Sequence, residues 1–129
     1  MKTPPIELAG LEVVLDRLVH HIDTERYPEE TPHAFIYFLT IRNYSDRRVQ
    51  LLGRKWVIEH ENGETVVVEV DKIVGHTPKL APGEEFSYNS FHLTATDCRA
   101  SGSFHGLDEF ENRVFVKIPP FSMKIPLSS

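Results

Sequence analysis

The sequence predicts an all-β domain with the strand pattern of a sandwich or barrel. Short apolar runs recur along the 129 residues and are separated by residues that favour turns. Within most runs the apolar side chains alternate with polar ones at period two, which is the spacing of a half-buried strand. The chain shows no internal repeat or low-complexity tract, and its length suits one domain with one core.

Composition and charge narrow the class of protein. Hydrophobic residues make up 40% and charged residues 26%, as in a soluble globular protein, and no apolar run is long enough to cross a membrane. The first five residues carry no apolar secretory signal, and Cys98 is the single cysteine, so we expect a cytoplasmic protein without an internal disulfide. The formal net charge of −5 argues against nucleic-acid or anionic-membrane binding.

The first clear strand covers residues 35–41 (FIYFLTI), which are rich in aromatic and β-branched side chains. Residues 49–58 form the next strand, but Trp56 is out of phase with Leu51 by one residue. Gly53 lies between them, so we expect a β-bulge at this glycine. The Asn62-Gly63 pair then suits a tight hairpin turn into a strand over residues 64–70 (ETVVVEV).

The second half of the chain continues the pattern. Pro82 and Gly83 occupy the central positions of a type II turn, which introduces a strand over residues 86–93. Residues 113–118 alternate again. The Pro119-Pro120 pair is expected to interrupt them, because proline cannot donate to a sheet ladder, before a last strand over residues 121–125.

Residues 11–23 fit two structures. Leu11, Leu15 and Leu18 follow helical spacing, whereas Leu11, Val13 and Leu15 follow strand spacing. Periodicity alone favours the helix slightly.

Several short segments, taken in order, resemble the ApaG domain family from about residue 11 to the C-terminus. The segments are Thr40-Ile41-Arg42-Asn43, Val49-Gln50-Leu51-Leu52 with Arg54 and Trp56, Asn62-Gly63, Val74-Gly75, Leu80-Ala81-Pro82-Gly83-Glu84 with Phe86 and Tyr88, and Ile118-Pro119-Pro120-Phe121. Their order and spacing together carry the resemblance.

The resemblance implies an immunoglobulin- or fibronectin-III-like sandwich of seven to eight mostly antiparallel strands. It divides the chain into an N-terminal extension, residues 1–10, and a sandwich domain, residues 11–129, and it makes residues 12–23 a strand. The family has no accepted catalytic activity, and a similar eukaryotic domain occurs within F-box proteins and a DNA-polymerase-delta-interacting protein. We therefore expect a binding module for a protein partner, not an enzyme. The alternative is a divalent-metal-linked protein, because the bacterial family is linked to cobalt and magnesium handling.

Some members of the family carry a GxGxxG-like loop that is proposed to hold pyrophosphate. Such glycines let backbone N–H groups approach phosphate closely. The corresponding residues 70–75 keep only Gly75, with Val70 and Lys72 at the first two glycine positions, and Asp71 would repel phosphate. We expect neither nucleotide nor pyrophosphate to bind.

The histidines and the cysteine form no recognisable catalytic or metal motif. The seven histidines lack the paired short spacing of a structural zinc site, and His20 and His21 would point to opposite faces of a strand. His92 and His105 with a carboxylate are the convergence that we consider. Cys98 is flanked by one acidic and one basic residue, so we interpret it as a structural thiol. We predict no catalytic residue, no metal site and no cofactor.

The aromatic residues divide between the core and the surface. Trp56 is predicted to fill the core, as the buried tryptophan of immunoglobulin-like sandwiches does. The phenylalanines of the C-terminal half lie among small and polar residues, and we expect at least one of them to be exposed. They are Phe91, Phe104, Phe110 and Phe121.

The partner surface is predicted on two stretches, residues 74–80 and 94–106, which interrupt the alternation and are interpreted as loops. Loops at the ends of a rigid scaffold commonly carry binding residues. The candidate partner-binding residues are Gly75, His76, Phe104 and His105.

Overall fold

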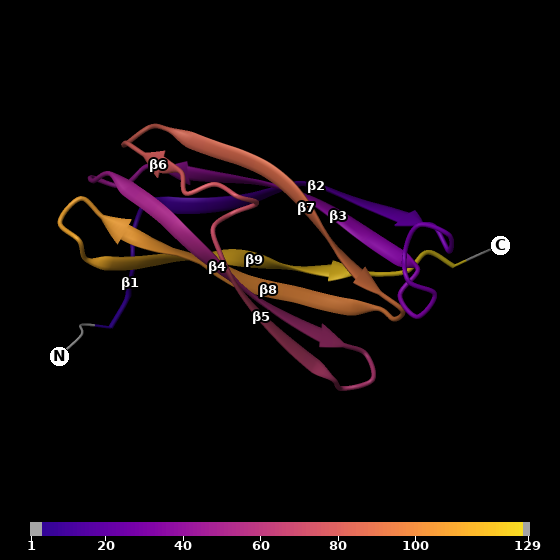
Figure 1. Ribbon diagram of the computed structural model, residues 1–129. Coiled ribbons are helices and arrows are strands. Elements are labelled where there is room, and N and C mark those ends of the chain that lie inside the picture. The colour runs from indigo at the N-terminus through magenta and orange to yellow at the C-terminus, as the bar shows by residue number, and fades with distance from the viewer. Residues whose placement is uncertain (1–3, 128–129) are drawn as a thin grey trace.

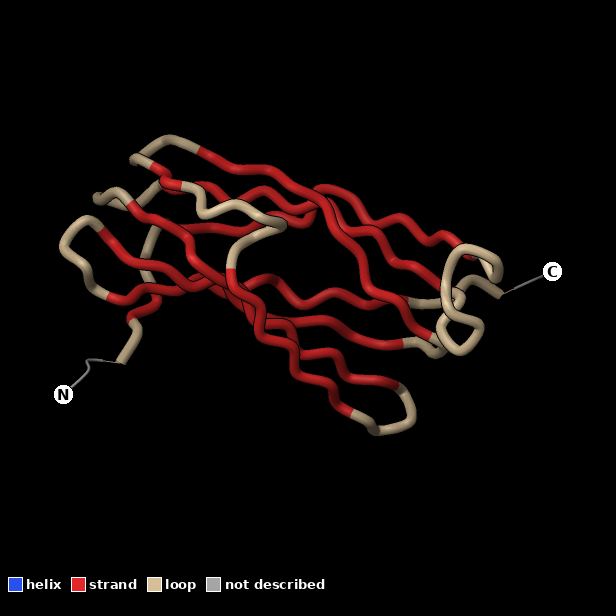
Figure 2. Tube along the Cα trace, viewed as in Figure 1, coloured by secondary structure: helices blue, strands red, loops and turns tan. Residues whose placement is uncertain are grey.

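Two β-sheets pack face to face in a computed structural model of the chain, which describes residues 4–127 (Figure 1). The strands within this range are β1 (Ile6–Glu7), β2 (Leu11–Ile22), β3 (His33–Asn43), β4 (Val49–His60), β5 (Thr65–Asp71), β6 (Lys79–Leu80), β7 (Glu85–Thr94), β8 (Cys98–Asp108) and β9 (Arg113–Met123). Figure 2 shows only strands and loops in this range, where no helix is long and apolar enough to cross a membrane. The predicted all-β sandwich is confirmed.

The larger sheet contains six strands in the order β1-β9-β8-β4-β5, with β6 also paired to β4. The smaller sheet contains three strands in the order β2-β3-β7. Every named strand pair is antiparallel except β1 with β9. Ile6 and Glu7 of β1 belong to the predicted extension 1–10. The described residues do not include 1–3, at the start of that extension, or 128–129, at the end of the predicted domain 11–129.

The N-terminal segment is the strand β2, so the helical alternative is wrong. Its register against β3 shifts between Leu15 and Arg17. The extra residue shifts by one position the alternation of side chains that point toward the core. Leu15 and Leu18 therefore both pack against the core, although they are three residues apart. The bulge therefore produces the helix-like spacing.

The predicted bulge in β4 is confirmed. Leu51 pairs with Gly106 of β8 and Gly53 pairs with His105, so Leu52 is the additional residue. Because of this extra residue, Leu51 and Trp56 both point into the core, where their side chains are 0% and 3% exposed.

Trp56 fills the core, as predicted, and its ring bridges the two sheets. Its ring lies 4.9 Å from the ring of Tyr37 in β3, measured between centroids, and 6.0 Å from that of Phe121 in β9. Aromatic pairs at these separations add to the energy of area burial.

The interpretation of residues 94–106 as a loop is wrong, because Cys98–Asp108 is the strand β8 between β4 and β9. Its inward positions alternate, but Ala100, Gly102 and Gly106 hold small side chains or none. A Cβ atom on Gly102 would lie 2.1 Å from the carbonyl oxygen of Lys55, and one on Gly106 would lie 2.0 Å from that of Gln50. The close approach of β8 to β4 thus requires glycine at these two inward positions. Because large apolar side chains are absent there, the sequence does not show the alternation of a strand.

Pro119 and Pro120 do not end a strand, because β9 continues from Arg113 to Met123. The β8–β9 register shifts there: Ala100 pairs with Phe121, whereas Gly102 pairs with Ile118. Both prolines therefore lie in a bulge, a position where a missing N–H donor is tolerated. The two predicted C-terminal strands are one.

Both predicted glycine turns are confirmed. Gly63 has a φ of +91° in the β4–β5 hairpin, and Gly83 has a φ of +92°. The amide of Glu84 donates to the carbonyl oxygen of Ala81 at 2.9 Å, which closes the turn before β7.

A group of buried polar atoms lies beside Trp56 between the sheets. Four buried side-chain atoms make no hydrogen bond within the described residues: Arg54 Nε, Trp56 Nε1, Tyr88 Oη and His92 Nε2. The His92 ring packs 4.8 Å from the Trp56 ring. Burial, and secondarily the charge of Arg54, lowers the pKa of His92 to about 4. This histidine is neutral in the folded protein near pH 7.

We predict that Trp56→Ala destabilises the fold by about 3–5 kcal/mol, the usual cost of truncating a large core aromatic. The free energy of unfolding, measured in urea, checks this. Val67→Ala is the matched control, because Val67 is 55% exposed on β5 and should cost less than about 1 kcal/mol. An unchanged denaturation midpoint for Trp56→Ala would contradict its bridging role.

A second prediction concerns acid stability. His92 binds a proton less readily in the folded state than in the unfolded chain. The free energy of unfolding therefore keeps its full value above the ordinary histidine pKa of about 6.5, and it falls as the pH decreases toward 4. His92→Phe keeps a ring between Tyr37 and Trp56 but cannot titrate. We expect the stability of this variant relative to the native protein to rise by on the order of 2 kcal/mol between pH 7.5 and pH 4.5. A relative stability independent of pH would contradict the assignment.

Candidate functional site

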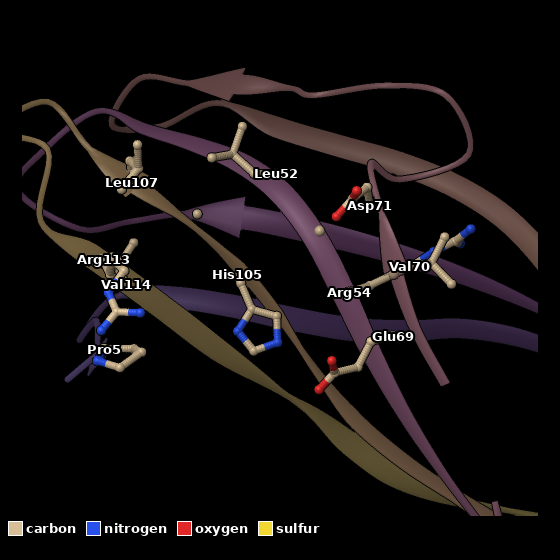
Figure 3. A pocket seen from close by; sticks show the side chains of 12 residues that line it. Pro5, Leu52, Arg54, Glu69, Val70, Asp71, His105, Leu107, Arg113 and Val114 are labelled. Carbon is tan, nitrogen blue, oxygen red and sulfur yellow. The ribbon is translucent and has the colours of Figure 1, made fainter. Parts of the chain in front are cut away.

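A cavity of about 640 Å³ opens on the outer face of the larger sheet (Figure 3). We call it the outer-face hollow. Glu69 and Asp71 of β5 line one side of it, and Arg113 of β9 and Pro5 line the other. Leu52 and Leu107 add apolar surface.

The fold creates this hollow through the β4 bulge and the glycine that follows it. Gly53 pairs with the outward-facing His105 of β8 and presents no side chain that would fill the hollow. His105 follows Phe104 in β8, and because successive strand residues point to opposite faces, its ring projects outward into the hollow.

His105 is a neutral, hydrogen-bonding group in the hollow. Its Nε2 lies 3.1 Å from Ser103 Oγ. Burial lowers the pKa of His105; the nearby Glu69 carboxylate opposes this and the Lys55 ammonium adds to it. Lys55 Nζ lies 3.9 Å from Glu69 Oε1, so the carboxylate is also paired along the sheet. A neutral imidazole can both donate and accept a hydrogen bond.

A tight loop, residues 72–78, continues from the hollow. Lys72 and Val74 have φ values of +65° and +49°, and Gly75 has +81°. The amide of Ile73 donates to the carbonyl oxygen of His76 at 2.8 Å, and the His76 amide donates back to Ile73 at 3.0 Å. Left-handed backbone at a β-branched residue costs about 1–2 kcal/mol, and such strain clusters at binding sites.

The four predicted partner-binding residues do not all lie on the surface. Gly75 and His76 are exposed on the loop, and the His76 ring lies 5.7 Å from that of Phe86 in the smaller sheet. His105 lies in the outer-face hollow. Phe104 is 0% exposed and packs 6.0 Å from the Tyr88 ring, so its prediction as a surface residue is wrong.

The histidine convergence is also not found. His92 faces the interior beside Trp56, whereas His105 faces outward, so the two rings cannot hold one ion. Within residues 4–127, no three His, Cys, Asp or Glu side chains are placed to hold a metal ion. His20 and His33 do meet, with Nε2 and Nδ1 2.8 Å apart, but they form only a pair.

The expectation of an exposed phenylalanine is confirmed twice. Phe91 is 52% exposed on β7 and Phe110 is 69% exposed in the β8–β9 turn. Phe104 and Phe121 are buried.

Sequence reasoning missed the partners of His105 in the hollow. Glu69 and Asp71 share a face of a correctly predicted strand, but their distance from His105 depends on the pairing of β4 with both β5 and β8. The sequence pattern over β8 indicates a loop, so it does not predict this pairing. Arg113 reaches the hollow through the β8–β9 pairing.

Comparison with known sequences identifies one family. A family model described as the ApaG domain matches residues 23–111. A curated Protein ApaG from Enterobacter sp. strain 638 is 36% identical over 107 residues, covering 82% of this chain and 86% of the relative. A Protein ApaG from Deinococcus radiodurans is 35% identical over 115 residues, covering 88% of each.

Solved structures share the fold over nearly the whole chain. A structural-genomics crystal structure superposes with a TM-score of 0.80 at 26% identity, covering 91% of this chain and 88% of the other. A Bordetella pertussis protein named ApaA superposes with a TM-score of 0.74 at 25% identity, covering 96% of this chain and 100% of the other.

The strained loop generates a third prediction. Val74→Gly should raise the free energy of unfolding by about 0.5–1 kcal/mol, because relief of the left-handed strain exceeds the entropy that glycine adds to the unfolded chain. Val67→Gly, at an exposed position of the regular strand β5, is the control and should lower it by about 1 kcal/mol. Equal destabilisation by both changes in urea unfolding would show that the loop is unstrained.

Proposed function

This chain belongs to the ApaG domain family, and from that premise we propose that it is a non-catalytic cytoplasmic binding module whose partner is a protein. The observation that carries the proposal is the outer-face hollow together with the loop beside it. His105, Glu69 and Asp71 offer hydrogen bonds and charge. Leu52 and Val74, 38% and 47% exposed, offer apolar contact. Mixed polar and apolar surface is typical of protein interfaces.

The chemistry of the candidate nucleophiles supports binding over catalysis. Burial raises the pKa of the Cys98 thiol; a hydrogen bond with Thr94 opposes this and Asp97 adds to it. A reactive cysteine requires the reverse shift. Ser103 and His105 form a hydroxyl–imidazole pair. The carboxylate whose charge acts on His105 is that of Glu69, and it is paired with Lys55. A catalytic serine needs a carboxylate that orients its histidine.

The remaining expectations about partners stay predictions: no nucleic acid, membrane, nucleotide or pyrophosphate is bound. No specific observation in residues 4–127 favours the divalent-metal-linked alternative, so binding of a protein is the function that we propose.

The proposed function is tested by capture of partners from the native cytoplasm on the tagged protein. The double variant His76→Ala/His105→Ala should weaken the affinity for a captured partner at least tenfold, about 1.4 kcal/mol, while the melting temperature stays nearly unchanged. The matched control is His21→Ala/Asn89→Ala, two exposed positions on the smaller sheet. If the control pair abolishes binding and the double variant binds normally, the hollow-and-loop surface is not the partner site.

A further inference from the structure

The strand β5 is an exposed sheet edge. All seven residues from Thr65 to Asp71 are exposed, including four valines that are 37–55% exposed. Figure 1 shows the β4–β5 hairpin projecting away from the smaller sheet, and no strand of residues 4–127 pairs with the outer side of β5. An edge of this kind is a template for pairing with another strand.

The other long edge strands of the two sheets differ from β5. The prolines and the bulge of β9 disrupt its outer edge, and β2 has a register break followed by Arg17. The inward side chains of β7 are half-buried against the core. Proline, lysine and bulges are the devices that protect edges, and β5 has none of them between Thr65 and Asp71.

The β4–β5 ladder determines which backbone groups of β5 face outward. The His60 amide donates to the Glu64 carbonyl oxygen at 2.8 Å, and the Lys72 amide donates to that of Leu52 at 2.7 Å. In an antiparallel pair, alternate residues bond to the same neighbour. The even-numbered residues of β5 therefore bond to β4, and the odd-numbered residues, 65 to 71, direct their N–H and C=O groups to the open edge.

We propose that a second copy of this chain pairs antiparallel with β5 across a two-fold axis at Val68. This register pairs all seven residues of the strand. Val66 then lies opposite Val70 of the other copy, and Val68 opposite itself, so the valines form a continuous apolar row. Cross-strand β-branched pairs of this kind stabilise sheets.

Charge complementarity supports the same register. Glu64 lies opposite Lys72 of the other copy, and the symmetry repeats this opposite-charge pair. The acidic side chains within the strand face neutral partners, since Glu69 lies opposite Val67 and Asp71 opposite Thr65. No two like charges are directly opposite, and such oppositions are what destabilise sheet pairs.

The dimer would extend the larger sheet through both copies. A two-fold axis perpendicular to the sheet keeps the two outer faces on the same side, so two outer-face hollows would flank the axis. A partner with two binding segments would then engage both, with the avidity that linked sites provide. The pairing itself does not depend on the proposed function.

Cysteine cross-linking tests the register under mild oxidation of the full chain. Val68 forms a non-hydrogen-bonded pair with its symmetry mate, where Cα atoms are about 4.5 Å apart and a disulfide can form. Val68→Cys should therefore give a covalent dimer. Val66→Cys alone should not, whereas a mixture of Val66→Cys and Val70→Cys should give a heterodimer. Cys98 is buried and stays unchanged in every variant. Asn89→Cys on the edge strand β7 is the control and should give no covalent dimer.

Sedimentation equilibrium tests the association without cross-linking. The native protein should show a concentration-dependent dimer, and Val68→Lys and Val68→Glu should each weaken it at least tenfold by opposing like charges on the axis. An equimolar mixture of these two variants should restore association. Val68 is 41% exposed, so both should keep the native circular dichroism spectrum.

Three results would overturn the proposal. The first is a native protein that stays monomeric up to about 1 mM. This result overturns the proposal even where substitutions in β5 abolish the capture of a different protein. The second is cross-linking of Asn89→Cys in preference to Val68→Cys, which would place the interface on β7. The third is a mixture of the charged variants that associates no better than either variant alone.

Discussion

The extra residue in β4, Leu52, is the constraint on which the rest of the structure depends. It shifts by one residue the alternation of inward and outward side chains along the strand. As a result, Leu51 before it and Trp56 after it both point into the core. A bulge also bends its strand and increases the local twist. The part of β4 after the bulge pairs with β5, and the part before it pairs with β6. One inserted residue thus separates the half of β4 that pairs with the short strand β6 from the half that pairs with the exposed strand β5.

The same phase shift turns Arg54 toward the interior. Its charge acts on Tyr37, Tyr88 and His92, which line the space between the sheets. A buried polar atom without a partner costs about 1–3 kcal/mol, and four such atoms meet in this region. Aromatic packing around Trp56 has to offset that cost. The core region therefore combines aromatic packing with buried polar groups.

Sequence patterns predicted the strands whose inward positions hold large apolar side chains, such as β3, β4 and β5. They failed where close packing replaced those side chains, as at Gly102 and Gly106 of β8. They also failed where a bulge altered the phase, as in β2 and at the prolines of β9. The outer-face hollow could not be predicted, because it depends on three strand registers at once. His105 was identified without the neighbours that define its chemistry.

The bulge also holds the strained loop. The carbonyl oxygen of Leu52 accepts the Lys72 amide at 2.7 Å, and the next side chain, Ile73, is 0% exposed. These two anchors keep Lys72 in the left-handed backbone that glycine favours, although a lysine occupies the position. The left-handed backbone at this position is therefore held without a glycine. Lys72 places an exposed side chain on the surface beside the hollow.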